Sequence, residues 1–118
     1  MAEIDCDHHL ASFVASFVVP PRRERWRHLL LSRGKKAFST SHKLYDALDR
    51  SVCTKLSGDP PVADSQVGVY YDFYEEPEVA RFGDIYERSL GTDAIFSATP
   101  GKLAVFFFHE GELWLCRK

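Results

Sequence analysis

The chain has 118 residues, of which 45% are hydrophobic and 14% aromatic, and its formal net charge is −2. These values exclude a disordered chain and predict one folded domain over residues 1–118 that buries roughly two-thirds of its unfolded surface. Three widely spaced cysteines, Cys6, Cys53 and Cys116, make no disulfide framework and suit a reducing compartment.

The apolar run 10–19 is too short to span a bilayer. Acidic residues precede it and two prolines follow it, which is not the order of a signal peptide. We therefore expect a cytoplasmic protein without a membrane partner. Within 7–19, apolar residues recur at helical spacing, and Asp5 or Asp7 is available as the N-cap. A helix ending near Val19 is predicted, and a strand ending at Val18-Val19 is the alternative.

Two further helices are predicted in this half. One runs from Pro21 to Arg33 with Gly34 as its stop, and the other from Ser39 or Ser41 to about residue 52. Residues 57–66 then form a loop that joins a helical, basic half (1–56) to a sheet-rich, acidic half (67–118).

The second half begins with residues 67–74, which alternate as in a half-buried strand, with Tyr70, Asp72 and Tyr74 on the more polar face. A fourth helix is predicted from Pro77 to about residue 90, with Gly91 just past its end. Three short apolar runs follow, at 93–98, 103–109 and 112–118, and the turns between them predict an antiparallel meander. The middle run lacks polar residues from 103 to 108, so it is predicted to be buried on both faces.

The fold class is therefore α+β, with N-terminal helices packed on one face of a roughly four-stranded antiparallel sheet that ends in the C-terminal β-meander. If Glu110-Gly111 is a two-residue loop, Phe107 lies opposite Trp114, and Val105, Phe107 and Trp114 share one apolar face. If helices cover only one side of the sheet, this face needs a further helix or a partner to cover it. The first hypothesis is accordingly a non-catalytic interaction or regulatory domain that binds a protein partner or forms a homodimer through it.

The second hypothesis is nucleic-acid binding. Residues 22–55 hold ten Lys or Arg against three acidic residues, whereas residues 56–116 hold three against eleven. Seven of the basic residues fall between positions 22 and 36 near Trp26, and six of them are the candidate phosphate contacts: Arg22, Arg23, Arg25, Arg27, Lys35 and Lys36. A solvated helix face, or pairing with the acidic half, is the competing interpretation.

The third hypothesis is a small-molecule-binding protein or an enzyme that uses Tyr70, Asp72 and Tyr74 with His109. A strand holds the first three side chains rigidly, although such rows also occur on exposed sheet faces. No catalytic motif is present, so whether the chain is an enzyme is left open, and no cofactor is predicted. The cluster 5–9 (Asp-Cys-Asp-His-His) has no second ligand pair and is interpreted as a polar helix start, not a metal site.

Overall fold

A computed structural model describes residues 3–32 and 35–118. Arg33 and Gly34, the predicted end of the second helix, lie outside them. The described chain is α+β, and its strands form one antiparallel sheet in the order β1-β6-β5-β4-β2-β3. Six strands are present where about four were predicted: β1 (Cys53–Lys55), β2 (Val67–Tyr71), β3 (Glu78–Arg81), β4 (Ala94–Thr99), β5 (Leu103–Phe107) and β6 (Leu113–Arg117).

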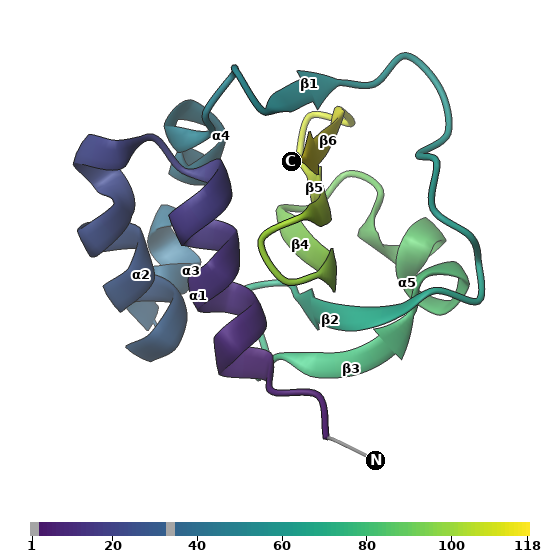
Figure 1. Ribbon diagram of the computed structural model, residues 1–118, viewed down its shortest axis with the longest axis horizontal. Coiled ribbons are helices and arrows are strands. Elements are labelled where there is room, and N and C mark those ends of the chain that lie inside the picture. The colour runs from purple at the N-terminus through teal and green to yellow at the C-terminus, as the bar shows by residue number, and fades with distance from the viewer. Residues whose placement is uncertain (1–2, 33–34) are drawn as a thin grey trace.

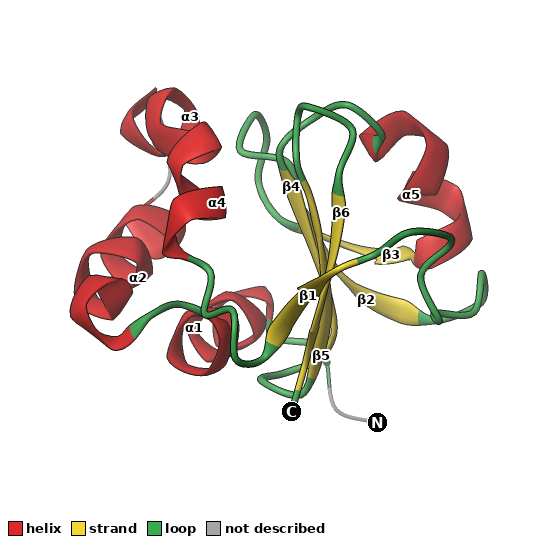
Figure 2. Ribbon diagram, turned by 90° about the horizontal axis from the view of Figure 1, so that it is seen from above, coloured by secondary structure: helices red, strands yellow, loops and turns green. Residues whose placement is uncertain are grey.

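Helices lie on both faces of this sheet (Figure 1). Four cover one face: α1 (Cys6–Phe17), α2 (Arg23–Ser32), α3 (Lys35–Thr40) and α4 (Leu44–Ala47). The prediction that the N-terminal helices pack on one face is confirmed, and Figure 2 shows that α5 (Phe82–Ser89) covers the opposite face. Among the described residues, no helix is both long and apolar enough to cross a membrane.

The predicted first helix is confirmed as α1. The carboxylate of Asp5 accepts a hydrogen bond from the backbone N–H of His8 at 3.1 Å and so caps the first turn. The helix buries Leu10, Phe13 and Phe17 against the sheet, and the chain turns extended at Val18. Val18 then pairs with Leu48. The predicted third helix is found as a short 3-10 helix, Ser41–Lys43, followed by α4. Because Leu48 is extended, α4 stops at Ala47, well before the predicted end at residue 52.

The predicted fourth helix is only half correct. Its first part is β3, a strand that pairs in register with β2 from Val67 opposite Arg81 to Tyr70 opposite Glu78. The helix begins at Phe82 and buries Phe82 and Ile85. Pro77 and the acidic residues after it match a helix start, but pairing with the free edge of β2 satisfies more backbone groups at this point of the chain.

The C-terminal meander is confirmed, and its hairpin register differs from the prediction by one residue. The loop has three residues, 109–111: the N–H of Gly111 bonds to the carbonyl of Phe108, and Gly111 has φ +90°. A type I turn followed by a left-handed glycine is the usual three-residue hairpin connection. The extra loop residue sets Phe106, not Phe107, opposite Trp114.

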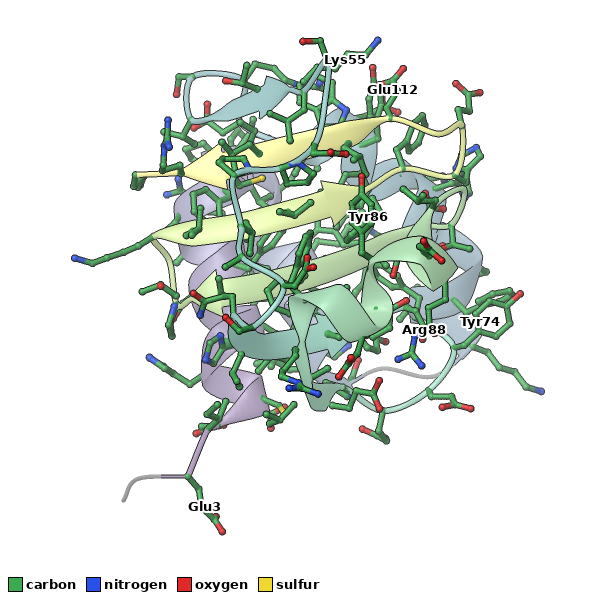
Figure 3. The ribbon with its side chains drawn as sticks, turned by 90° about the vertical axis from the view of Figure 1, so that its right-hand side faces the viewer. Glu3, Lys55, Tyr74, Tyr86, Arg88 and Glu112 are labelled. Atoms are coloured by element: carbon green, nitrogen blue, oxygen red, sulfur yellow. The ribbon has the colours of Figure 1, made fainter. Side chains whose placement is uncertain are left out.

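This shift separates the three predicted interface residues. Val105 and Phe107 lie on the face covered by α5, whereas Trp114 lies on the face covered by α1–α4. Val105 and Phe107 are 0% exposed and Trp114 is 8% exposed. Phe82 of α5 contacts Phe107, and Leu56 and Val62 of the β1–β2 loop pack on the same cluster. Figure 3 looks onto α5 where it covers this face. The bare face on which the dimer hypothesis rests is therefore absent.

Candidate functional site

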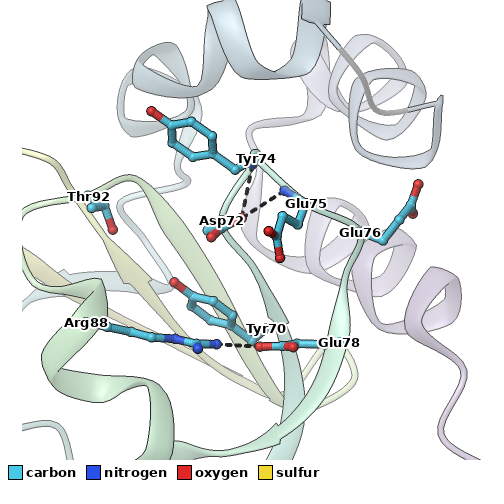
Figure 4. Close-up of a pocket in the computed structure, with 8 residues that line it drawn as sticks. All are labelled: Tyr70, Asp72, Tyr74, Glu75, Glu76, Glu78, Arg88 and Thr92. Carbon is cyan, nitrogen blue, oxygen red and sulfur yellow. Dashed lines mark hydrogen bonds and ion pairs between the residues drawn. The ribbon is translucent and has the colours of Figure 1, made fainter.

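A pocket of about 610 Å³ opens where β2 ends, beside the last turn of α5 (Figure 4). Three of the four residues predicted to bind a ligand line it: Tyr70, Asp72 and Tyr74. The structure adds five more lining residues: Glu75, Glu76, Glu78, Arg88 and Thr92. Strand β2, the β2–β3 turn, β3 and α5 each contribute, so the site depends on the whole end of the sheet.

The β2–β3 turn that carries Tyr74 is held in a strained conformation. Phe73 has φ +68°, a left-handed backbone that costs a phenylalanine about 1–2 kcal/mol. Its ring is buried against Tyr71, with 4.8 Å between the ring centroids, and Asp72 Oδ1 accepts backbone N–H bonds from Tyr74 at 3.0 Å and Glu75 at 3.2 Å. The turn thus buries Phe73 and directs the side chain of Tyr74 outward, where it is 75% exposed. Strain of this kind is concentrated at functional sites.

The floor of the pocket is Tyr70. Its hydroxyl is hydrogen-bonded to Ser89 Oγ at 3.0 Å, and burial raises the pKa of this phenol. Arg88 lies over the ring, with its Cζ 5.1 Å from the centroid, and pairs with the carboxylate of Glu78. Tyr70 is therefore a protonated side chain with a fixed ring, and the guanidinium of Arg88 already lies over that ring.

The charge of the pocket is strongly negative. Four carboxylates line it, those of Asp72, Glu75, Glu76 and Glu78, and among its described lining residues Arg88 is the only base. Because Arg88 is already paired with Glu78, the carboxylates of Asp72 and Glu75 give the opening its negative charge. Such a site attracts positive charge and repels anions.

A second pocket of about 330 Å³ adjoins the first and shares Asp72, Tyr74 and Thr92 with it. Its other side is formed by α3 and the β5–β6 loop, which bring in Phe38 and His109. Phe38 packs against Tyr74 with ring centroids 4.5 Å apart, although both side chains are exposed. The fourth predicted ligand residue, His109, therefore lies in the same region as the other three.

The carboxylate of Asp93 orients His109. One oxygen, Oδ1, lies 3.0 Å from His109 Nδ1 and also accepts the backbone N–H of His109 at 3.0 Å. The imidazole is 44% exposed. A histidine held by a carboxylate can move protons, but no hydroxyl or thiol nucleophile is hydrogen-bonded to this ring among the described residues.

The basic residues proposed to bind nucleic acid are divided between structural and exposed positions. Arg23 Nε donates to the carbonyl of Val18 at 2.8 Å, and Arg22 donates to that of Asp46 at 3.4 Å, so both tie α2 to neighbouring segments. Arg25, Arg27, Lys35 and Lys36 are exposed, whereas Trp26 is buried and cannot stack on a base.

Of the N-terminal cluster, residues 5–9, only His9 belongs to the core, whereas Asp5, Asp7 and His8 are exposed. His9 is buried, with Nδ1 2.8 Å from Ser97 Oγ on β4. His9 is 6% exposed and Ser97 is 1% exposed, so the fold shields both side chains from solvent. Over the residues with described positions, no group of three or more His, Cys, Asp or Glu side chains is placed to hold a metal ion.

Comparison with family models, with curated proteins and with solved structures finds no match for this chain. The site is therefore interpreted from its geometry alone. From the alternation of the sequence alone, Tyr70, Asp72 and Tyr74 were predicted to belong to one site. This prediction missed Glu75 and Glu76, although they directly follow Tyr74, and it missed Arg88 and Phe38, which only the tertiary fold brings near.

Proposed function

We propose that this protein is a non-catalytic binding domain whose site is the acidic, tyrosine-lined pocket at the end of β2, and that it binds a positively charged amine or guanidinium group. The observation that carries the proposal is the combination of the Asp72 and Glu75 carboxylates with an outward-pointing tyrosine, Tyr74, on a strained turn. This deepens the binding hypothesis based on Tyr70, Asp72 and Tyr74.

Charge selects the class of ligand. A cation that enters beside Glu75 meets several carboxylates and one guanidinium that is already paired, so the net field is attractive. A phosphate or carboxylate would be repelled by the same residues. Because the opening is solvent-exposed, the attraction is screened by salt.

The aromatic residues supply the second contact. Arg88 already lies over the ring of Tyr70, which shows that this site accommodates a guanidinium on an aromatic face. Tyr74 offers a second ring at the opening, supported from behind by Phe38. Cation–π contacts of this kind contribute about 0.5–2 kcal/mol, which corresponds to a few-fold to about thirtyfold in Kd.

Isothermal titration calorimetry of four proteins tests the proposal: the wild type, Tyr74→Ala, Glu75→Gln and the control Glu87→Gln. Glu87 is an exposed carboxylate on α5 that does not line the pocket. The probes are agmatine, which is a small guanidinium compound, and an end-capped pentapeptide containing one arginine. We expect Tyr74→Ala and Glu75→Gln each to weaken binding several-fold and Glu87→Gln to bind as the wild type does.

The two probes distinguish the sources of the cation. Binding of agmatine and peptide alike indicates a site for the cationic group itself, and binding of the peptide alone indicates a protein segment as the ligand. Equal weakening by Glu75→Gln and Glu87→Gln would show that general surface charge, not the pocket, attracts the cation. Binding of neither probe at low salt would overturn the proposal.

A further inference from the structure

The register between β1 and β6 places two cysteines directly opposite each other. Cys53 pairs with Cys116, and the flanking hydrogen bond runs from the N–H of Arg117 to the carbonyl of Val52 at 3.0 Å. A bond in this position makes Cys53 and Cys116 a non-hydrogen-bonded pair, in which opposite Cα atoms of antiparallel strands are about 4.5 Å apart. Disulfides occur at Cα separations of about 4.4–6.8 Å. The Cα separation expected for this pair therefore falls within the range of a disulfide.

The two side chains also point the same way. Both belong to the core cluster beneath α1, and both are buried as free thiols. Cys53 Sγ lies 3.6 Å from the carbonyl of Phe17. A hydrogen bond with Cys53 and burial hold the pKa of the Cys116 thiol well above its usual range. In the closed fold the Cys116 thiol is thus protonated and slow to react.

Access to the pair depends on an edge strand of three residues. β1 forms one end of the sheet and pairs with β6 alone. Thr54 and Lys55 are exposed, and the loop 56–66 follows directly. Short edge strands at the sheet margin open at far lower free energy than the whole fold, and opening β1 uncovers both sulfurs together.

We propose that Cys53 and Cys116 are a redox-sensitive dithiol, which a low-molecular-weight disulfide such as oxidised glutathione converts to a cross-strand disulfide. In the opened strand, the thiolate of one cysteine attacks a sulfur of the small disulfide and releases one thiol, which leaves a mixed disulfide on the protein. The second cysteine, as its thiolate, attacks the protein sulfur of that mixed disulfide and releases the other thiol. Two protein thiols are oxidised, one small disulfide is reduced, and the two thiol protons end on the two released thiols.

The third cysteine serves as an internal contrast. Cys6 contacts Pro77, in the connection to β3 at the opposite end of the sheet from β1. It is therefore expected to form only a mixed disulfide with glutathione. The Cys6→Ser substitution removes that adduct and leaves Cys53 and Cys116 as the only thiols.

The experiment equilibrates the Cys6→Ser protein in mixtures of reduced and oxidised glutathione, quenches with acid, unfolds, and alkylates the remaining thiols for mass spectrometry. We expect both thiols to become protected together, without a retained glutathione, and the peptides containing Cys53 and Cys116 to be linked. The linked protein should also show a higher urea midpoint, because the bridge joins residues across more than half of the chain.

Two results would overturn this inference. The first is that Cys53 and Cys116 stay alkylatable in mixtures that oxidise the same protein when it is unfolded in urea. The second is stable glutathione adducts on either residue instead of a link between them. The Cys53→Ser variant, checked for folding by circular dichroism, should retain a glutathione adduct on Cys116 and should not gain the higher urea midpoint in oxidising buffer.

Discussion

The imidazole of His9 lies between α1 and β4, with Nδ1 2.8 Å from Ser97 Oγ. Burial lowers the pKa of this histidine from its ordinary value of 6.5, and neighbouring His8 adds to the effect. As the pH falls through 6.5, the unfolded chain takes up a proton at this position while the folded chain resists it. The contribution of His9 therefore lowers the free energy of unfolding as the pH falls.

A substitution isolates this effect. We expect the urea midpoint of the wild type to fall between about pH 7.5 and pH 5.5, and the fall to be smaller in His9→Gln, because glutamine does not titrate in this range. The control is His28→Gln, since His28 is exposed on α2. A fall in His9→Gln as large as that in the wild type would mean that other groups cause the pH dependence.

At the pocket, some residues could be predicted from the local sequence, whereas the conformation of others depends on tertiary contacts. Alternation along 67–74 grouped Tyr70, Asp72 and Tyr74, which line one pocket, but the predicted strand is too long: β2 ends at Tyr71, so Asp72 and Tyr74 lie in the turn after it. The left-handed Phe73 could not be predicted, because the burial of its ring and the hydrogen bonds of Asp72 impose that conformation. This turn decides that Tyr74 points outward, so the site depends on information that no local pattern contains.

At the scale of elements, β2 and β4 approach each other too closely for a side chain at Gly68. A Cβ there would press on the carbonyl oxygen of Ser97 and lie 2.8 Å from the Phe96 ring. A backbone carbonyl within a sheet cannot move aside without breaking the ladder.

We expect Gly68→Ala to lower the free energy of unfolding by about 1–3 kcal/mol, measured by urea denaturation. Gly58→Ala is the matched control, because a Cβ there meets nothing within 4 Å, and its effect should be within about 0.5 kcal/mol. Equal stability of the two variants would show that β2 and β4 are not in this register.

Two elements show where sequence patterns were sufficient and where they were not. The C-terminal meander could be predicted because its strands are local in sequence and bounded by Gly-containing turns. Strand β3 could not, because residues 77–81 carry a helix-start pattern and become a strand only by pairing with β2. The predicted hairpin register was wrong because the residues around Gly111 are compatible with both a two-residue and a three-residue loop. In the structure Gly111 has φ +90°, which belongs to the longer loop.

At the scale of the molecule, both faces of the sheet are covered by the chain itself. Trp114 illustrates this: its ring lies 5.5 Å from Tyr45 and 4.1 Å from the guanidinium of Arg50, within one chain. Truncating this buried side chain leaves a cavity.

We expect Trp114→Ala to lower the free energy of unfolding by about 3–5 kcal/mol, whereas truncation of the exposed Leu90 should change it by about 0.5 kcal/mol or less. Denaturation at two protein concentrations checks the origin of the loss. A wild-type midpoint that rises with concentration, and a Trp114→Ala midpoint that does not, would instead place Trp114 in a contact between chains.

We propose that the acidic pocket at the end of β2 binds a cationic group. Amide chemical-shift mapping during an agmatine titration is the direct test of this binding. If agmatine binds in the pocket, the amide chemical shifts of residues 70–78, 88 and 92 should change in a saturable way, and the changes should shrink when salt is added. Residues 22–36 should show no comparable changes. Shifts spread over the acidic half without saturation, or no shifts at all at low salt, would contradict it.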